Sequence, residues 1–123
     1  MDYYLLADMT VQIGYELAVA GAETYRVEET MRRVIEAYGT EGQVFAIPNC
    51  VAVSFVTPNT KPLTIMKRVG YHGNDLERIE KLNALSRRIC AEVPDPETAQ
   101  RWLKETMYYY VHDYDEYFEE KQV

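Results

Sequence analysis

Hydrophobic residues in this chain change their spacing twice, and these changes limit the folds that the chain can adopt. Before residue 39 they recur at intervals of three and four residues, which is typical of amphipathic helices. In the middle of the chain the period falls to two, with Val51, Val53 and Phe55 alternating with less apolar neighbours. Beyond residue 75 the helical spacing returns. The sequence therefore predicts helices, then strands, then helices.

The first helical pattern covers residues 3–19 and ends at Gly21, a residue type that often follows the last turn of a helix. Its apolar stripe is expected to face a core. A second pattern begins at Glu23 or Thr24 and stops at Gly39. We expect these two helices to form an antiparallel pair.

The alternating segment predicts a strand at residues 51–56, a turn at 57–60 and a second strand at 63–69. Pro62 fits this interpretation only at the start of a strand or at a sheet edge, because proline donates no ladder hydrogen bond. A third short strand at residues 44–47 would complete a small antiparallel sheet.

Two further helices are predicted after the sheet. Asn74 is a candidate N-cap for a helix that ends before Pro94, and Asp95 precedes another helix with Pro96 at its first position. The predicted fold class is therefore α+β: an N-terminal helix pair, a small antiparallel sheet, and two C-terminal helices packed on one face of that sheet.

Composition restricts the function classes. A chain of 123 residues, 47% of them hydrophobic, fits one globular domain. Its formal net charge of −7, with no basic run longer than a pair, argues against nucleic acid as a partner. Cys50 and Cys90 lack a CxxC spacing and are expected to be free thiols in a reducing compartment. Without a signal peptide or an apolar run of about 20 residues, the chain is expected to be cytoplasmic.

We divide the chain into a domain at residues 1–105 and a tyrosine-rich, acidic helical tail at residues 106–123. Helical spacing of apolar residues continues into this tail, through Leu103, Met107, Tyr110, Tyr114 and Tyr117. Such a stripe can bury against the domain, against another chain or at a membrane surface. The membrane surface fits least, because helices that lie there usually carry basic polar faces.

No catalytic or metal-binding motif stands out. Ser54 lies within a predicted strand rather than in a GxSxG turn, and His72 lies in a glycine-flanked turn. The two histidines, His72 and His112, form no ligand set with carboxylates at helical spacing, so we expect neither a metal nor a cofactor. Enzyme activity stays an open question, and a hydrolase is the reaction class that is kept.

A set of charged and polar residues could converge on one ligand: Glu23, Arg26, Glu28, Thr64, Arg68, Asn83 and Arg87. On the second helix, one stripe carries Glu23, Arg26, Thr30 and Arg33, and the apolar residues lie on another. An arginine fork suits the carboxylate of an amino acid, and a glutamate suits its ammonium group. In the alternative interpretation, the arginines pair with Glu23, Glu28 and Asp75 and join the helices to the sheet.

Five short motifs occur in a defined order: GAETYRVE at residues 21–28, VAVSF at 51–55, TIMKRV at 64–69, NDL at 74–76 and LNALSR at 82–87. Their order and spacing resemble the N-terminal soluble domain of the threonine/serine exporter family, from about residue 8 to about residue 105. The resemblance implies a domain on the cytosolic side of an ion-driven exporter, for which a hydrolase-like activity is sometimes suggested. The positions that match the family pattern are Gly21, Glu23, Arg26, Glu28, Thr64, Arg68, Asn74, Asn83 and Arg87.

Three functional hypotheses follow. The leading one is an accessory binding or assembly module of such an exporter. This module would be homo-oligomeric and attached to a membrane-embedded exporter subunit or domain at the cytosolic face of the cell membrane. Its ligand would be a small amino acid. The second is a small hydrolase for peptides or amino-acid derivatives, with Arg26 and Glu23 in its site. The third is a self-contained protein-interaction domain whose tyrosine-rich last helix pairs with another chain.

Overall fold

A computed structural model describes the backbone of residues 1–58 and 61–122, with side chains in these ranges as far as Tyr108 and at Tyr110. The elements follow in the order α1 (Tyr3–Ala20), α2 (Thr24–Ala37), β1 (Gly42–Ile47), β2 (Cys50–Val56), β3 (Pro62–Arg68), α3 (Leu76–Glu92) and α4 (Pro96–Gln122). The strands form one antiparallel sheet in the order β1-β2-β3. The predicted α+β class and the order of helix pair, sheet and helix pair are confirmed.

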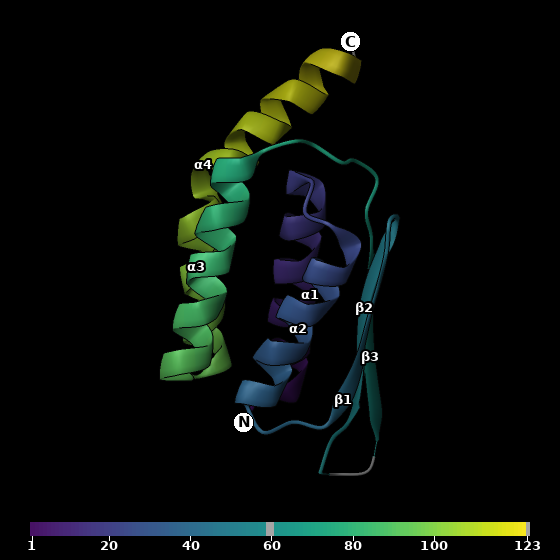
Figure 1. Ribbon diagram of the computed structural model, residues 1–123, viewed down its shortest axis with the longest axis vertical. Helices are drawn as coiled ribbons and strands as arrows, with labels where there is room; N and C mark the ends of the chain where they lie inside the picture. Colours follow the sequence, from purple (N-terminus) through teal and green to yellow (C-terminus); the bar gives the residue numbers. More distant parts are fainter. Residues whose placement is uncertain (59–60, 123) are drawn as a thin grey trace.

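The elements form three layers (Figure 1). The sheet is one outer layer, α1 and α2 form the middle layer, and α3 and α4 form the other outer layer. Helix α1 packs on β2 and β3, α2 packs on β1, and both C-terminal helices pack on α1. One detail thus differs from the sequence-based expectation: the N-terminal pair covers the sheet, and the C-terminal helices cover the N-terminal pair.

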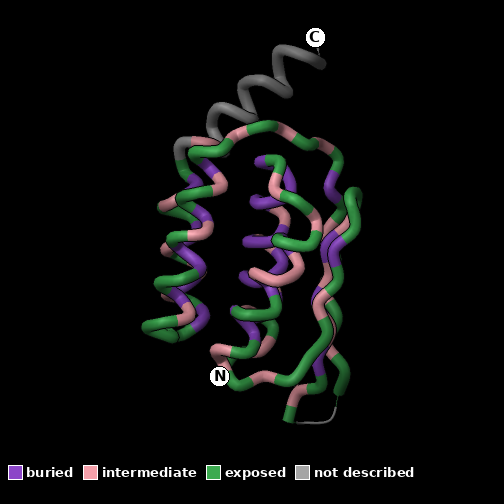
Figure 2. Tube along the Cα trace, viewed as in Figure 1, coloured by how far each residue is buried: buried purple, intermediate pink, exposed green. Residues whose placement is uncertain are grey.

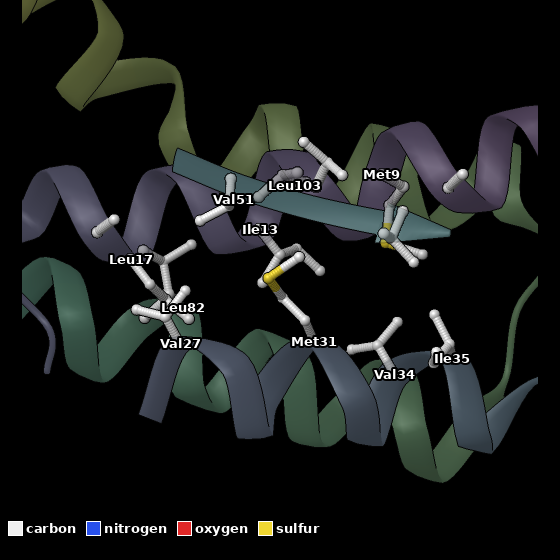
Figure 3. Close-up of a cluster of buried hydrophobic side chains, with 14 of the residues drawn as sticks. Met9, Ile13, Leu17, Val27, Met31, Val34, Ile35, Val51, Leu82 and Leu103 are labelled. Atoms are coloured by element: carbon white, nitrogen blue, oxygen red, sulfur yellow. The ribbon is translucent and has the colours of Figure 1, made fainter. Parts of the chain in front are cut away.

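The apolar character of α1 explains this layering. Twelve of its 18 residues are buried, and they lie all round the helix rather than on one stripe. A helix that is apolar on every side must be enclosed by other elements. In Figure 3, Ile13 of α1 lies beside Met31 of α2, whereas Leu17 lies beside Val27 of α2 and Leu82 of α3. Helix α1 is therefore the centre of the core, and Figure 2 shows it as the most continuously buried segment.

Two glycines allow close approaches at α1. A Cβ atom on Gly14 would overlap the side chain of Met31, so the absence of a side chain there lets α1 and α2 pack closely. Gly21 follows the end of α1 with a φ of 99°, in the left-handed region that favours glycine. Its backbone N–H donates to the carbonyl of Ala18 at 3.0 Å, which closes the last turn of the helix.

The loop from the sheet to α3 crosses the C-terminal end of α1. The backbone N–H groups of Gly73 and Asp75 donate to the carbonyls of Val19 and Ala20, at 2.6 and 2.9 Å. These bonds satisfy carbonyl groups that the end of a helix leaves without intrahelical partners. A side chain on Gly21 would also clash with the backbone of Gly73. The contact therefore fixes where α3 begins relative to α1.

Helix α3 begins one residue later than predicted, and its N-cap is Asp75 rather than Asn74. The Asp75 carboxylate accepts a hydrogen bond from the backbone N–H of Arg78 at 3.0 Å. The backbone of Asp75 has φ −123° and ψ 89°, outside the helical region, so the helix begins only at Leu76. A carboxylate also complements the positive end of the helix dipole.

Helix α4 continues without a break through residue 105, so the proposed division of the chain falls inside it. Leu103 and Met107 are buried in the core, and the Tyr110 hydroxyl donates to Glu77 on α3 at 3.0 Å. The predicted stripe thus packs against the domain as far as Tyr110, while the side chains of Tyr114 and Tyr117 lie outside the described residues. The cysteines at positions 50 and 90 are both free and half-buried.

A buried ion pair joins α1 to α3. The Glu16 carboxylate accepts a hydrogen bond from the Arg78 guanidinium, and the two residues are only 4% and 2% exposed. The Gln12 amide also donates to Glu16 at 3.0 Å and accepts from the Lys67 ammonium group of β3 at 2.9 Å. On the other side, the Tyr110 ring lies 5.4 Å from the Arg78 guanidinium. A polar network therefore runs from the sheet through α1 to the outer helices.

The variant Arg78→Met is expected to lower the free energy of unfolding by about 3–5 kcal/mol, because it leaves the Glu16 carboxylate buried without its cation. The double variant Glu16→Leu/Arg78→Met should recover most of this loss, since it removes both desolvated charges. Urea unfolding of the single and double variants measures both effects. A loss below about 1 kcal/mol in the single variant would contradict a structural role for the pair.

Tyr38, just after α2, makes stability depend on pH in the alkaline range. Its hydroxyl donates to the carbonyl of Pro94. Burial, and then the negative charge of Asp95, raise the pKa of Tyr38 from 10.0 to about 12. Since the folded state holds this proton more tightly than the unfolded state, the stabilising contribution is complete below pH 10.0 and is lost as the pH rises towards about 12. In Tyr38→Phe, urea unfolding should therefore show a shallower alkaline decline, and a decline as steep as in the parent protein would refute this assignment.

Candidate functional site

A groove of about 740 Å³ lies between α2 and α3. Leu17 of α1 and Ile79 of α3 give it an apolar floor. Its polar lining comes from both helices: Arg26, Glu29, Thr30, Arg33 and Glu36 on α2, and Asn83, Ser86, Arg87 and Cys90 on α3. The groove thus combines three guanidinium groups with two carboxylates and several neutral polar groups.

Helical periodicity brings these residues to one place. On α2, Arg26, Thr30 and Arg33 recur at steps of four and three, while Val27 and Met31 point to the core. On α3 the same spacing links Asn83, Ser86, Arg87 and Cys90. Two facing stripes therefore form the walls of the groove, and each wall belongs to a helix whose other side is fixed by burial.

Two of the three guanidinium groups in the groove have partners within α2. Arg33 donates to Glu29 at 2.6 Å, in an exposed pair one helical turn apart. The Arg26 guanidinium donates to the Tyr25 hydroxyl at 3.2 Å, and this hydrogen bond raises the pKa of Arg26 further above its ordinary value. The guanidinium of Arg87 makes no ion pair or hydrogen bond with the residues that the structure describes. Arg87 is therefore the cation most available to a ligand.

Cys90 joins the two walls at one part of the groove. Its thiol donates to the backbone carbonyl of Arg33 at 3.6 Å. Burial is the main reason why the pKa of the Cys90 thiol lies above its ordinary value of 9.0. The thiol is accordingly protonated at neutral pH and is a weak nucleophile.

The groove contains three of the seven residues in the predicted cluster, Arg26, Asn83 and Arg87. Glu23 and Glu28 line a different hollow on the other flank of α2. Glu23 is the N-cap residue of α2 and has an extended backbone, with φ −63° and ψ 140°, so its side chain leaves the helical stripe on which the sequence placed it. Glu28 follows Arg26 by two residues, which is about 200° around the helix.

Glu28 makes a contact that links α2 to the sheet. Its carboxylate accepts a hydrogen bond from the backbone N–H of Ala46 at 3.1 Å. Ala46 belongs to β1, which is an edge strand, and a free N–H at a sheet edge is a site for pairing with other chains. The Glu28 carboxylate therefore closes part of this edge and is fixed away from the groove.

Thr64 and Arg68 lie on the face of the sheet that points away from the helices. The Thr64 hydroxyl shares a hydrogen bond with the Ser54 hydroxyl on β2 at 2.8 Å, and Arg68 is exposed. Alternation along β3 turns Ile65 and Lys67 towards the helices instead. The structure thus separates these two residues from the groove by the whole thickness of the middle layer.

The arginine–carboxylate pairs of the alternative interpretation are not among the described contacts. Asp75 caps α3, and the buried pair is Glu16–Arg78. A carboxylate inside the apolar segment of residues 5–20 was the sequence signal for such a pair, since a buried charge needs a partner. The predicted cluster also left out Glu29 and Ser86, which follow Arg26 and Asn83 by three residues on the same helical faces and line the groove.

The groove lacks the usual parts of a hydrolytic site among the described residues. The Ser86 hydroxyl donates to the carbonyl of Asn83 at 2.9 Å, and no histidine lines the groove. His72 lies at the C-terminal end of α1, where Nδ1 is 3.2 Å from the carbonyl of Ala18. The side chain of His112 lies outside the described residues. The guanidinium, carboxylate, amide and hydroxyl groups that line the groove are suited to binding by charge and hydrogen bonds.

The family model for threonine/serine exporters, ThrE, matches residues 8–110. No curated protein and no solved structure matches the chain. Among the described residues, no helix combines the length and the apolar character that crossing a bilayer requires. The family match covers more than half of the chain and agrees with the resemblance drawn from its five motifs. The chain belongs to the threonine/serine exporter family.

Proposed function

We propose that this domain is the cytosolic accessory module of a threonine/serine exporter system, and that its α2–α3 groove binds a small α-amino acid. One observation carries the proposal: the guanidinium of Arg87, which has no partner among the described residues, shares a groove with the carboxylate of Glu29 and the amide of Asn83. Membership of the exporter family supports the link to amino-acid transport.

The groove offers a group for each part of an α-amino acid. The planar fork of Arg87 can hold both oxygens of the carboxylate, and Arg26 adds a second positive charge. Glu29 is an acceptor for the ammonium group, because its pair with Arg33 uses only one of its carboxylate oxygens. Hydroxyl and amide groups of Thr30, Ser86 and Asn83 are available for a side-chain hydroxyl.

Arg87→Ala should weaken binding of L-threonine about 10- to 100-fold, since a hydrogen bond to a charged group is worth about 1.5–3 kcal/mol. Isothermal titration calorimetry measures this change. Arg101→Ala is the matched control, because Arg101 is an exposed arginine on α4 outside the groove. Thermal melting should change little in both variants, since removing an exposed side chain without partners rarely alters stability.

A second readout locates the ligand. In a Cys50→Ser background, alkylation by iodoacetamide reports only on Cys90, which lines the groove. Saturating L-threonine should slow this alkylation, and Arg87→Ala should abolish the protection at the same ligand concentration. Absence of binding by the parent protein, or an equal loss in the Arg101→Ala control, would refute the amino-acid site. Turnover of an aminoacyl p-nitroanilide that is lost in Arg26→Ala would favour the hydrolase instead.

A further inference from the structure

A second hollow, which we call the α1–α4 cavity, lies between α1 and α4. Its volume of about 590 Å³ is within the range of small-molecule sites. Among the described residues, none lines both this cavity and the α2–α3 groove. The cavity is therefore a separate candidate site. Its lining comes from two helices: Asp8, Gln12 and Glu16 on α1, and Gln100, Leu103, Lys104, Met107 and Tyr108 on α4.

Helical spacing gives the cavity a polar wall and an apolar one. On α1, Asp8, Gln12 and Glu16 recur at steps of four, so their side chains follow one another along the same face. On α4, Leu103 and Met107 are also four residues apart, and each is only 2% exposed. A ligand in the cavity would thus meet polar groups on α1 and a fixed apolar surface on α4.

The polar groups near Glu16 already have partners in the protein. The Glu16 carboxylate pairs with the Arg78 guanidinium and also accepts from the Gln12 amide at 3.0 Å. The Gln12 carbonyl oxygen in turn accepts from the Lys67 ammonium group at 2.9 Å. The charge of Glu16 is therefore compensated without a ligand.

The two other charges of the cavity are not compensated. The half-buried Asp8 carboxylate accepts from the Gln100 amide through one oxygen, at 2.8 Å, and forms no ion pair with a described residue. Lys104, which is exposed, makes neither an ion pair nor a hydrogen bond with the part of the chain that the structure describes. A carboxylate and an ammonium group thus line one cavity without pairing with each other.

These two charges and the apolar wall together select the chemistry of the ligand. A simple cation would be attracted by Asp8 and repelled by Lys104, and a simple anion the reverse. A zwitterion compensates both, and an apolar body beside its charges can pack on Leu103 and Met107. We infer that the α1–α4 cavity binds an α-amino acid with an apolar side chain.

The spacing of the charged groups fits such a ligand. Lys104 follows Gln100 by one helical turn, about 6 Å, and Gln100 is bonded to Asp8. The flexible stem of Lys104 can therefore reach a carboxylate whose neighbouring ammonium group is held by the second oxygen of Asp8. Neither serine nor threonine is among the described residues that line the cavity, so a hydroxyl on the ligand's side chain finds fewer partners here than in the α2–α3 groove.

Isothermal titration calorimetry with L-leucine and two analogues tests the inference. The amine 3-methylbutylamine lacks the carboxylate of leucine, and 4-methylpentanoate lacks its ammonium group. L-Leucine should bind, and each analogue should bind at least about tenfold more weakly, since each leaves one charge of the cavity uncompensated. An amine that binds as tightly as L-leucine, or a parent protein that binds no L-leucine at about 10 mM, would overturn the inference.

Two variants assign the charges. Asp8→Asn keeps an oxygen that can accept from Gln100, and Lys104→Met keeps the length of the side chain. Each should weaken L-leucine binding about 10- to 100-fold. Lys61→Met is the matched control, because Lys61 is an exposed lysine outside the cavity, and this variant should bind like the parent. Equal binding by Lys104→Met and the parent would overturn the zwitterion, even if Asp8→Asn failed to fold.

A location readout separates this site from the α2–α3 groove, on which the inference does not depend. In the Cys50→Ser background, saturating L-leucine should leave the alkylation rate of Cys90 unchanged, since Cys90 lines the groove and not the cavity. Arg87→Ala should bind L-leucine like the parent, whatever its effect on L-threonine. Protection of Cys90 by L-leucine, or loss of L-leucine binding in Arg87→Ala, would place the ligand in the groove and overturn the inference.

Discussion

The enclosure of α1 is the constraint on which the rest of the structure depends. This helix is apolar on all sides, so one covering layer is not enough for it, and the sheet and the outer helices must lie on opposite sides. Its one buried carboxylate, Glu16, adds a chemical requirement to the geometric one, because a buried charge needs a partner. Arg78 meets that requirement and positions α3, while the cap at Gly21 positions the loop that precedes α3.

The groove is a product of the same packing. Helices α2 and α3 both rest on α1 and contact each other, but small side chains line their junction, among them Ala22, Ala37 and Ala91. Because these residues fill little of the space between the two helices, the longer polar side chains stand around a hollow instead of covering a core. The charged residues in the groove are therefore held on rigid elements, although their own tips are exposed. This arrangement is typical of a binding site that is formed before its ligand arrives.

The sequence predicted the type and order of the elements, because hydrophobic period is a local property of the chain. It did not predict the layering. Whether α1 is buried on one side or on several depends on the elements that surround the helix. Helical spacing grouped Arg26 with Thr30, and Asn83 with Arg87, and all four residues line the groove. The positions of Thr64 and Arg68 depended on the direction in which β3 faces, and this is set by long-range pairing. Local spacing carries no information of that kind.

The Glu16–Arg78 pair also has a consequence for the way in which the chain reaches its native state. Its two residues are 62 positions apart, so α1 cannot be fully enclosed until most of the domain has been synthesised. Until then the emerging chain carries a long apolar helix and one charge that has no partner. Contacts between residues so far apart in the sequence slow folding, and they prolong the exposure of apolar surface that chaperones recognise. Helix α1 precedes the other described elements in the chain, yet its surroundings are complete only when α3 and α4 have packed on it.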